Sequence, residues 1–144
     1  MTRYLLDTNI VSEAAKPHPA PAIAEWLRGR SASDLFITTL TIAEIWRGIL
    51  ELPSGRRRVS LQAWFVGSEG PQALFRQRVL AFDEASALEW GRIIAEGRAT
   101  GRSRSPLDMI IAAIAVANDC VVVTANERHF EGIIEFINPL RIAG

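Results

Sequence analysis

The sequence has little of what stabilises secreted proteins or anchors membrane proteins. Its only cysteine, Cys120, cannot form an internal disulfide, and its place in the apolar run 120–123 indicates a buried packing residue. No apolar run approaches the roughly 18 residues of a membrane span. Asp7 also ends the first apolar run before it reaches the length of a signal-peptide core. We therefore expect a cytoplasmic protein that does not enter a membrane.

Histidine and lysine are equally scarce. The chain holds only two histidines besides the single cysteine, which argues against a zinc site. Its 16 basic and 16 acidic residues cancel, which excludes a protein that coats nucleic acid by charge alone. All basic residues except Lys16 are arginines, whose planar guanidinium suits phosphate contacts. The arginine clusters at 56–58 and 98–104 are equally explained as solvated faces.

The hydrophobic pattern predicts one α/β domain over residues 1–144, with a parallel central sheet of about four or five strands flanked by helices. Five apolar runs predict strands at 4–6, 35–37, 79–82, 121–124 and 135–137. The intervening segments predict helices at 23–30, 41–52, 57–65, 84–100 and 106–118, with a helical hairpin at about 41–66.

Four polar residues are placed to meet at one end of this sheet, because open parallel sheets bind ligands at the carboxyl ends of their strands. Asp7 follows the first strand, and Glu44 lies in the first turn of the helix after the second. Asp108 begins the helix before the fourth strand, and Asn126 follows that strand. All four can therefore face one pocket.

Each acid also has a purely structural explanation as a helix cap. Thr41 and Glu44 have the spacing of a capping box, and Ser105 with Asp108 resembles a second one. Asp7 could cap the short turn 9–13. Three acids at one sheet end would nevertheless repel one another, and a bound cation relieves such repulsion. Oxygen ligands favour Mg²⁺ or Mn²⁺, which can activate water for phosphodiester cleavage.

Four segments, in order along nearly the whole chain, carry a resemblance to a known family: 4–13 (YLLDTNIVSE), 38–49 (TTLTIAEIWRGI), 106–115 (PLDMIIAAIA) and 123–130 (VTANERHF). They resemble the motifs of the PIN-domain family. Within it the chain is most similar to the toxin halves of bacterial toxin–antitoxin pairs, the VapC and FitB-like proteins. The resemblance implies an Mg²⁺- or Mn²⁺-dependent endoribonuclease that forms a homodimer. It also implies inhibition by an antitoxin protein whose tail fills the active-site groove.

Carried onto this sequence, the family's acidic cluster falls on Asp7, Glu44 and Asp108, which become the expected metal ligands and catalytic residues. The fourth acidic position of the family falls on Asn126, which supplies no charge and would hold a second metal only weakly. His129 stands where many relatives carry another acid, and the sequence assigns it no role.

Six further residues are expected to support the acids or to bind phosphate: Thr8, Asn9, Arg47, Thr124, Arg102 and Arg104. Thr8 and Asn9 can donate to Asp7 or to a phosphate, and Thr124 can orient a metal-bound water. They are equally explained as turn residues. The arginines could grip phosphate or guide RNA toward the metal. The helical hairpin, with Trp46, Ile49, Leu50, Leu61, Trp64 and Phe65, could supply the antitoxin groove.

Two other functions stay open at this point. A phosphohydrolase of the haloacid dehalogenase type would also place an Asp at the end of the first strand, but it needs an acid where Asn9 stands. A catalytically inactive binding module of the PIN fold would explain the loss of the fourth acid at Asn126.

Overall fold

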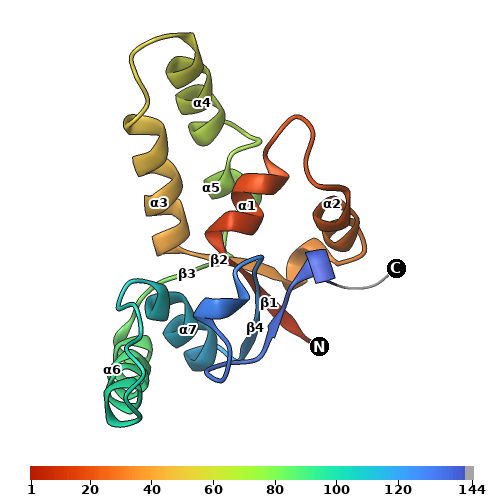
Figure 1. Cartoon of the computed structure of the whole chain (residues 1–144). Coiled ribbons are helices and arrows are strands. Elements are labelled where there is room, and N and C mark those ends of the chain that lie inside the picture. Colours follow the sequence, from red (N-terminus) through yellow and green to blue (C-terminus); the bar gives the residue numbers. More distant parts are fainter. Residues whose placement is uncertain (142–144) are drawn as a thin grey trace.

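A five-stranded parallel sheet forms the centre of the computed structural model, which describes residues 1–141 (Figure 1). The strands are β1 (Arg3–Leu6), β2 (Leu35–Thr38), β3 (Val79–Leu80), β4 (Cys120–Val123) and β5 (Phe136–Ile137). Their order is β3-β2-β1-β4-β5, and every neighbouring pair is parallel. The predicted sheet is confirmed. The last three positions of the expected 1–144 domain lie outside the described residues.

The helices connect the strands and cover the sheet. They are α1 (Thr8–Ala14), α2 (Pro21–Arg28), α3 (Thr39–Leu50), α4 (Arg56–Val66), α5 (Pro71–Leu74), α6 (Glu84–Ala99) and α7 (Asp108–Ala117). Single 3₁₀ turns occupy Ala32–Asp34, Glu127–His129 and Pro139–Arg141. The sequence did not predict α5, and it predicted the third strand two residues too long. That strand pairs with β2 only through Val79 and Leu80. The chain then turns into α6, whose N-terminus is capped by Asp83.

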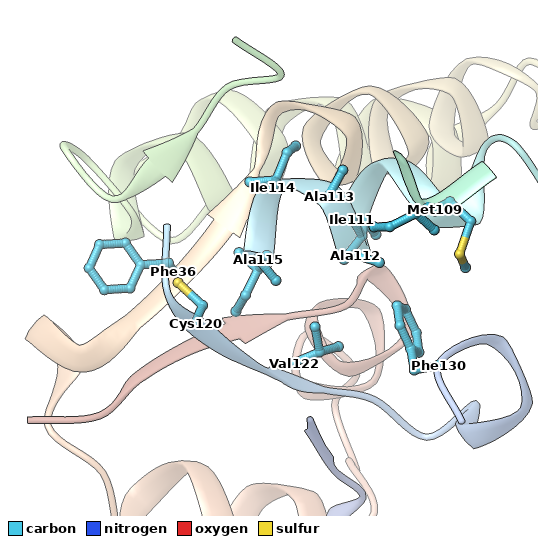
Figure 2. Packing of buried hydrophobic residues seen from close by; sticks show 12 residues of the cluster. Phe36, Met109, Ile111, Ala112, Ala113, Ile114, Ala115, Cys120, Val122 and Phe130 are labelled. Carbon is cyan, nitrogen blue, oxygen red and sulfur yellow. The ribbon is translucent and has the colours of Figure 1, made fainter. Parts of the chain in front are cut away.

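The three central strands bury both faces, as expected for a parallel sheet covered on two sides. On one face Leu5, Phe36 and Val122 pack against α7, and Figure 2 shows Phe36 and Val122 beside this helix. Helix α7 is apolar almost all round because α6 packs against it as well. Cys120 belongs to this cluster, so its predicted packing role is confirmed. On the other face Leu6 packs with residues of α1 and α2.

The predicted helical hairpin is formed by α3 and α4, which extend away from the sheet (Figure 1). Trp46 of α3 stacks against Phe65 of α4, with ring centroids 4.7 Å apart. This aromatic contact holds the two helices together beyond the edge of the sheet. Among the described residues, no helix is long and apolar enough to cross a membrane.

Candidate active site

A cleft of about 270 Å³ opens at the carboxyl ends of the central strands. Its lining residues are Asp7, Thr8, Asn9, Leu40, Glu44, Leu107, Asp108, Ile111, Asn126, His129 and Phe130. The fold therefore brings together the four polar residues that the sequence placed at this end of the sheet. The lining contains three carboxylates and no lysine or arginine. A cation from outside the chain would relieve this concentration of negative charge.

Asp7 is the most firmly held of the three acids. It caps α1 by accepting a hydrogen bond from the backbone N–H of Thr8 at 2.8 Å. Its Oδ2 accepts from the Thr124 hydroxyl at 2.9 Å and from the Asn9 amide at 3.1 Å. Three donors therefore fix both carboxylate oxygens. Asp7 caps the helix, as its position predicted, and at the same time is held by Asn9 and Thr124.

Burial also sets the electrostatics of Asp7, whose residue surface is only 8% exposed. Removal from water raises the pKa of its carboxyl group above the ordinary value, because the charged form loses hydration. The hydrogen bonds from Thr124 and Thr8 oppose this shift, whereas the nearby charges of Glu44 and Asp108 add to it. Burial therefore disfavours the charged form of Asp7, and a bound cation would offset this cost.

Glu44 is not the capping residue that its spacing from Thr41 predicted. The cap of α3 is Thr38, whose hydroxyl accepts from the backbone N–H of Thr41 at 3.1 Å. The helix therefore begins earlier than expected, and the Glu44 side chain is released from the helix start. Its Oε1 instead accepts from the Thr8 hydroxyl at 2.6 Å, which ties α3 to α1 across the cleft.

Asp108 is the first residue of α7 and is about one-third exposed. The second predicted capping box is loose, since the N–H of Asp108 lies 3.5 Å from the Ser105 hydroxyl, at the limit of a hydrogen bond. The carboxylate faces His129 instead, with Oδ2 3.3 Å from the imidazole Nδ1. Sequence reasoning gave His129 no role, and the one available signal was its place three residues after Asn126, in the turn that follows β4.

Asn126 borders the cleft with an exposed side chain, and its contribution to the site's structure comes from its backbone. The N–H of Asn126 donates to the Thr124 hydroxyl at 2.9 Å. The Asn9 side-chain oxygen accepts from the N–H of Ala125 at 3.1 Å. The loop after β4 is therefore tied to the Asp7 network from two sides, and Asn9 cannot serve as the second acid of a dehalogenase-type site.

None of the three arginines predicted to support the site lines the cleft. Arg47 is exposed and lies 3.8 Å from Glu51, toward the far end of α3. Arg104 donates to the backbone oxygen of Ile93 at 2.7 Å and closes over Gly97, where a Cβ atom would clash with its side chain. Arg104 is thus a structural residue that fastens the loop to α6. Arg102 is exposed outside the cleft.

The donor set fits a divalent ion that keeps much of its water. Among residues 1–141, no three His, Cys, Asp or Glu side chains come close enough to ligate one ion together. Magnesium is commonly bound by one or two carboxylates, with waters and substrate phosphates filling the other positions. Asp7 and Asp108, with Glu44 beside them, match this way of binding magnesium. Within residues 1–141 the protein does not surround an ion with three or more of its own ligands.

Comparison with known proteins decides the family. The model of the PIN domain matches residues 4–133. The chain belongs to the PIN-domain family. The predicted resemblance is confirmed, and family membership favours the ribonuclease hypothesis over the dehalogenase alternative.

Two relatives and one solved structure show where the chain falls in this family. It is 32% identical over 136 residues to the VapC ribonuclease Y4jK of Sinorhizobium fredii, an alignment that covers 94% of this chain and 96% of the relative. It is 31% identical over 126 residues to the toxin FitB of Neisseria gonorrhoeae, covering 88% and 89%. A chain in the crystal structure of FitAcB from the same organism matches with a TM-score of 0.88 at 28% identity, covering 96% of this chain and 99% of that one. The predicted PIN-like fold is confirmed.

Proposed function

We propose that this PIN-domain protein is the toxin of a toxin–antitoxin pair and cleaves RNA phosphodiesters with a divalent cation. The observation that carries the proposal is the cleft itself, in which three carboxylates converge without a basic side chain among the lining residues. The names of the two relatives, a ribonuclease and a toxin, support the substrate and the biological role. The resemblance favours Mg²⁺, with Mn²⁺ as the alternative.

In this proposal Asp7 and Asp108 hold the ion, and Glu44 lies beside it. When bound, the ion would activate a water molecule and neutralise charge on the scissile phosphate. The protein's own part is to keep the ligands in place. Thr124 and Asn9 prevent the Asp7 carboxylate from rotating, and the Thr8 hydroxyl holds Glu44 toward the cleft. Asn126 borders the cleft and can contact a water there.

A cleavage assay tests the proposal. The purified chain is incubated with a panel of transfer, ribosomal and messenger RNAs in Mg²⁺ or Mn²⁺, and the cut sites are sequenced. We expect cleavage that stops with a chelator and in Asp7→Asn. The matched control is Asp119→Asn, because Asp119 is exposed and precedes β4 at the opposite end of the sheet. Equal activity in Asp7→Asn and Asp119→Asn would contradict the proposal.

One feature favours a second function, a PIN-fold binding module without catalysis. Asn126 stands at the family's fourth acidic position, and the position of His129 is also not acidic. Both residues line the cleft, and their side-chain nitrogen atoms come within 3.3 Å of each other. Absence of cleavage of every RNA in both metals, together with tight binding of the cognate antitoxin, would favour this second function.

A groove between α1, α3 and α4 is our proposed antitoxin site. It measures about 640 Å³ and is lined on its apolar side by Ile49, Leu61 and Trp64, three of the residues that the sequence suggested. Thr8 and Glu44 line both this groove and the cleft, so an occupant could reach the carboxylates. The other suggested residues have different positions: Trp46 and Phe65 pack inside the hairpin, and Leu50 lies outside the groove.

Substitution inside the groove tests the antitoxin site. We expect Leu61→Glu to weaken binding of the cognate antitoxin at least tenfold without loss of RNA cleavage. Val59→Glu is the control, because Val59 is 64% exposed on the same helix and outside the groove. Equal antitoxin affinity in both variants would place the partner elsewhere. The mass of the free protein in solution tests the homodimer that the family resemblance implies.

A further inference from the structure

A second depression, of about 590 Å³, adjoins the cleft and contains the arginines that the cleft lacks. Asn126 lines both spaces, so a bound chain that leaves the cleft past this residue enters the depression. The depression is formed by the segment after β4 and by the turn after β5, and we call it the arginine hollow. Its lining residues are Ala125, Asn126, Glu127, Arg128, Glu131, Asn138, Leu140 and Arg141.

The arginine hollow contains two arginines and two glutamates, but the two charges are not equally exposed. Nε of Arg141 lies 3.1 Å from Oε2 of Glu127, and the side chain of Arg141 is 74% exposed whereas that of Glu127 is only 19% exposed. Glu127 therefore holds the guanidinium through one nitrogen and leaves its other N–H donors open to solvent. Arg128 is exposed, and among residues 1–141 its side chain makes no ion pair or hydrogen bond. The one exposed acid of the hollow is Glu131.

A buried amide adds an uncharged donor to the hollow. Asn138 is 8% exposed, and its Oδ1 accepts a hydrogen bond from the N–H of Leu140 at 3.0 Å. In the part of the chain that the structure describes, no protein group accepts from its amide nitrogen, which leaves N–H groups for a ligand. Guanidinium and amide groups are common donors to the phosphate oxygens of bound nucleic acids.

The cleft offers no basic side chain to the phosphates that flank a cleavage site, because its charged lining residues are acids. A bound ion would neutralise charge at the scissile phosphate alone. We propose that the arginine hollow binds the phosphate backbone of RNA, with Arg128 and Arg141 contacting phosphates next to the one that is cleaved. The inference rests on the proposed function for the identity of the substrate. It adds the path of the strand, which runs from the cleft past Asn126 into the hollow.

The salt dependence of RNA binding tests the proposal. A labelled pool of single-stranded RNA of random sequence serves as the probe, because phosphate contacts carry no sequence information. Fluorescence anisotropy in the presence of a chelator, which prevents cleavage, gives the affinity at several salt concentrations. The proteins are wild type, Arg128→Gln, Arg141→Gln and the control Arg76→Gln. Arg76 is exposed and precedes β3, at the opposite end of the sheet from the cleft.

We expect the control to bind as wild type does. Each of the two hollow variants loses one phosphate contact, which should weaken binding roughly fivefold at about 0.1 M salt. The same loss should reduce the slope of log affinity against log salt concentration by about 0.7. An arginine that acted only through the structure of the loop would lower the affinity without this change of slope.

Glu131→Gln gives a readout of the opposite sign. It removes the exposed acid of the hollow and with it the repulsion of RNA phosphates, so RNA binding should tighten by about twofold or more at low salt. A variant that merely disturbed the loop would bind RNA more weakly.

Three results would overturn the proposal: no RNA binding by wild type, a loss in Arg76→Gln equal to that in Arg128→Gln, or an unchanged salt slope in both hollow variants. The cleavage assay separates this failure from that of the proposed function. RNA cleavage with an unchanged slope overturns the arginine hollow alone. A reduced slope in the hollow variants, without cleavage by wild type in either metal, overturns the nuclease and leaves the hollow as an RNA-binding site.

Discussion

The two sides of the cleft are built differently. On one side the buried Asp7 is held by three hydrogen bonds of 2.8–3.1 Å from Thr8, Asn9 and Thr124. On the other side Asp108, Asn126 and His129 are open to solvent, and the His129 ring lies 3.3 Å from each of the other two side chains. The protein's own hydrogen bonds therefore organise the first side, and the second side is left open to solvent. A metal site of this kind can accept ion and substrate from solvent while keeping one ligand fixed.

The largest effect should follow from breaking the organised side. Asp7→Asn removes a ligand charge and places a second amide against that of Asn9, so we expect RNA cleavage to fall at least about 10³-fold, equivalent to roughly 4 kcal/mol. Asp108→Asn removes a charge from the open side, where a water molecule can take the place of the carboxylate. The factor by which it lowers the cleavage rate should therefore be at least ten times smaller than the factor for Asp7→Asn. Single-turnover cleavage rates measure both. A larger loss in Asp108→Asn would reverse the comparison.

Removal of one hydroxyl tests whether the hydrogen bonds of the organised side matter. Thr124→Val has nearly the same shape but neither donates to Asp7 nor accepts from the N–H of Asn126. We expect a 10–100-fold loss of metal affinity and a fall of about 1–3 kcal/mol in the free energy of unfolding, because the buried Asp7 carboxylate and the partly buried N–H of Asn126 each lose a partner. Calorimetric titration and urea unfolding measure the two effects. Unchanged metal affinity would show that Asp7 needs no such support.

The pH dependence of stability provides a third test of the organised side. In metal-free protein the raised pKa of Asp7 means that the folded state keeps its proton at a pH where the unfolded state has lost it. Relative to Asp7→Asn, which does not titrate, wild type should therefore lose stability as pH rises from the ordinary value of 3.8 through the raised pKa, and keep that deficit above it.

Urea unfolding at pH 4 to 8 with a chelator measures this difference. Asp119→Asn is the matched control, because it removes an exposed acid at the opposite end of the sheet. A gap between wild type and Asp7→Asn that is constant with pH would contradict the burial argument. Addition of the metal should reduce the gap, since an ion that binds only the folded state stabilises it.

Sequence patterns predicted the fold and the meeting of the acids because strand apolarity and strand ends are local properties. They failed where tertiary contacts compete with local ones. The capping pattern of Thr41 and Glu44 is real in the sequence, but Thr38 at the end of β2 caps the helix first. From the sequence Arg104 could be expected to bind RNA. In the structure its side chain instead packs over Gly97 and donates to the backbone of Ile93, and this contact forms only once α6 and the following loop have folded.

The smallest effect is expected on the open side, at Asn126. Asn126→Ala removes only the exposed amide, since the bond from its backbone N–H to Thr124 stays in place. Exposed substitutions of this kind usually change stability by no more than about 0.5 kcal/mol, and we expect a similarly small change in cleavage rate, roughly twofold. Single-turnover rates in Mn²⁺ measure it. A loss of tenfold or more would mean that substrate orders the amide in the cleft, and the two sides would then be equally organised in the working enzyme.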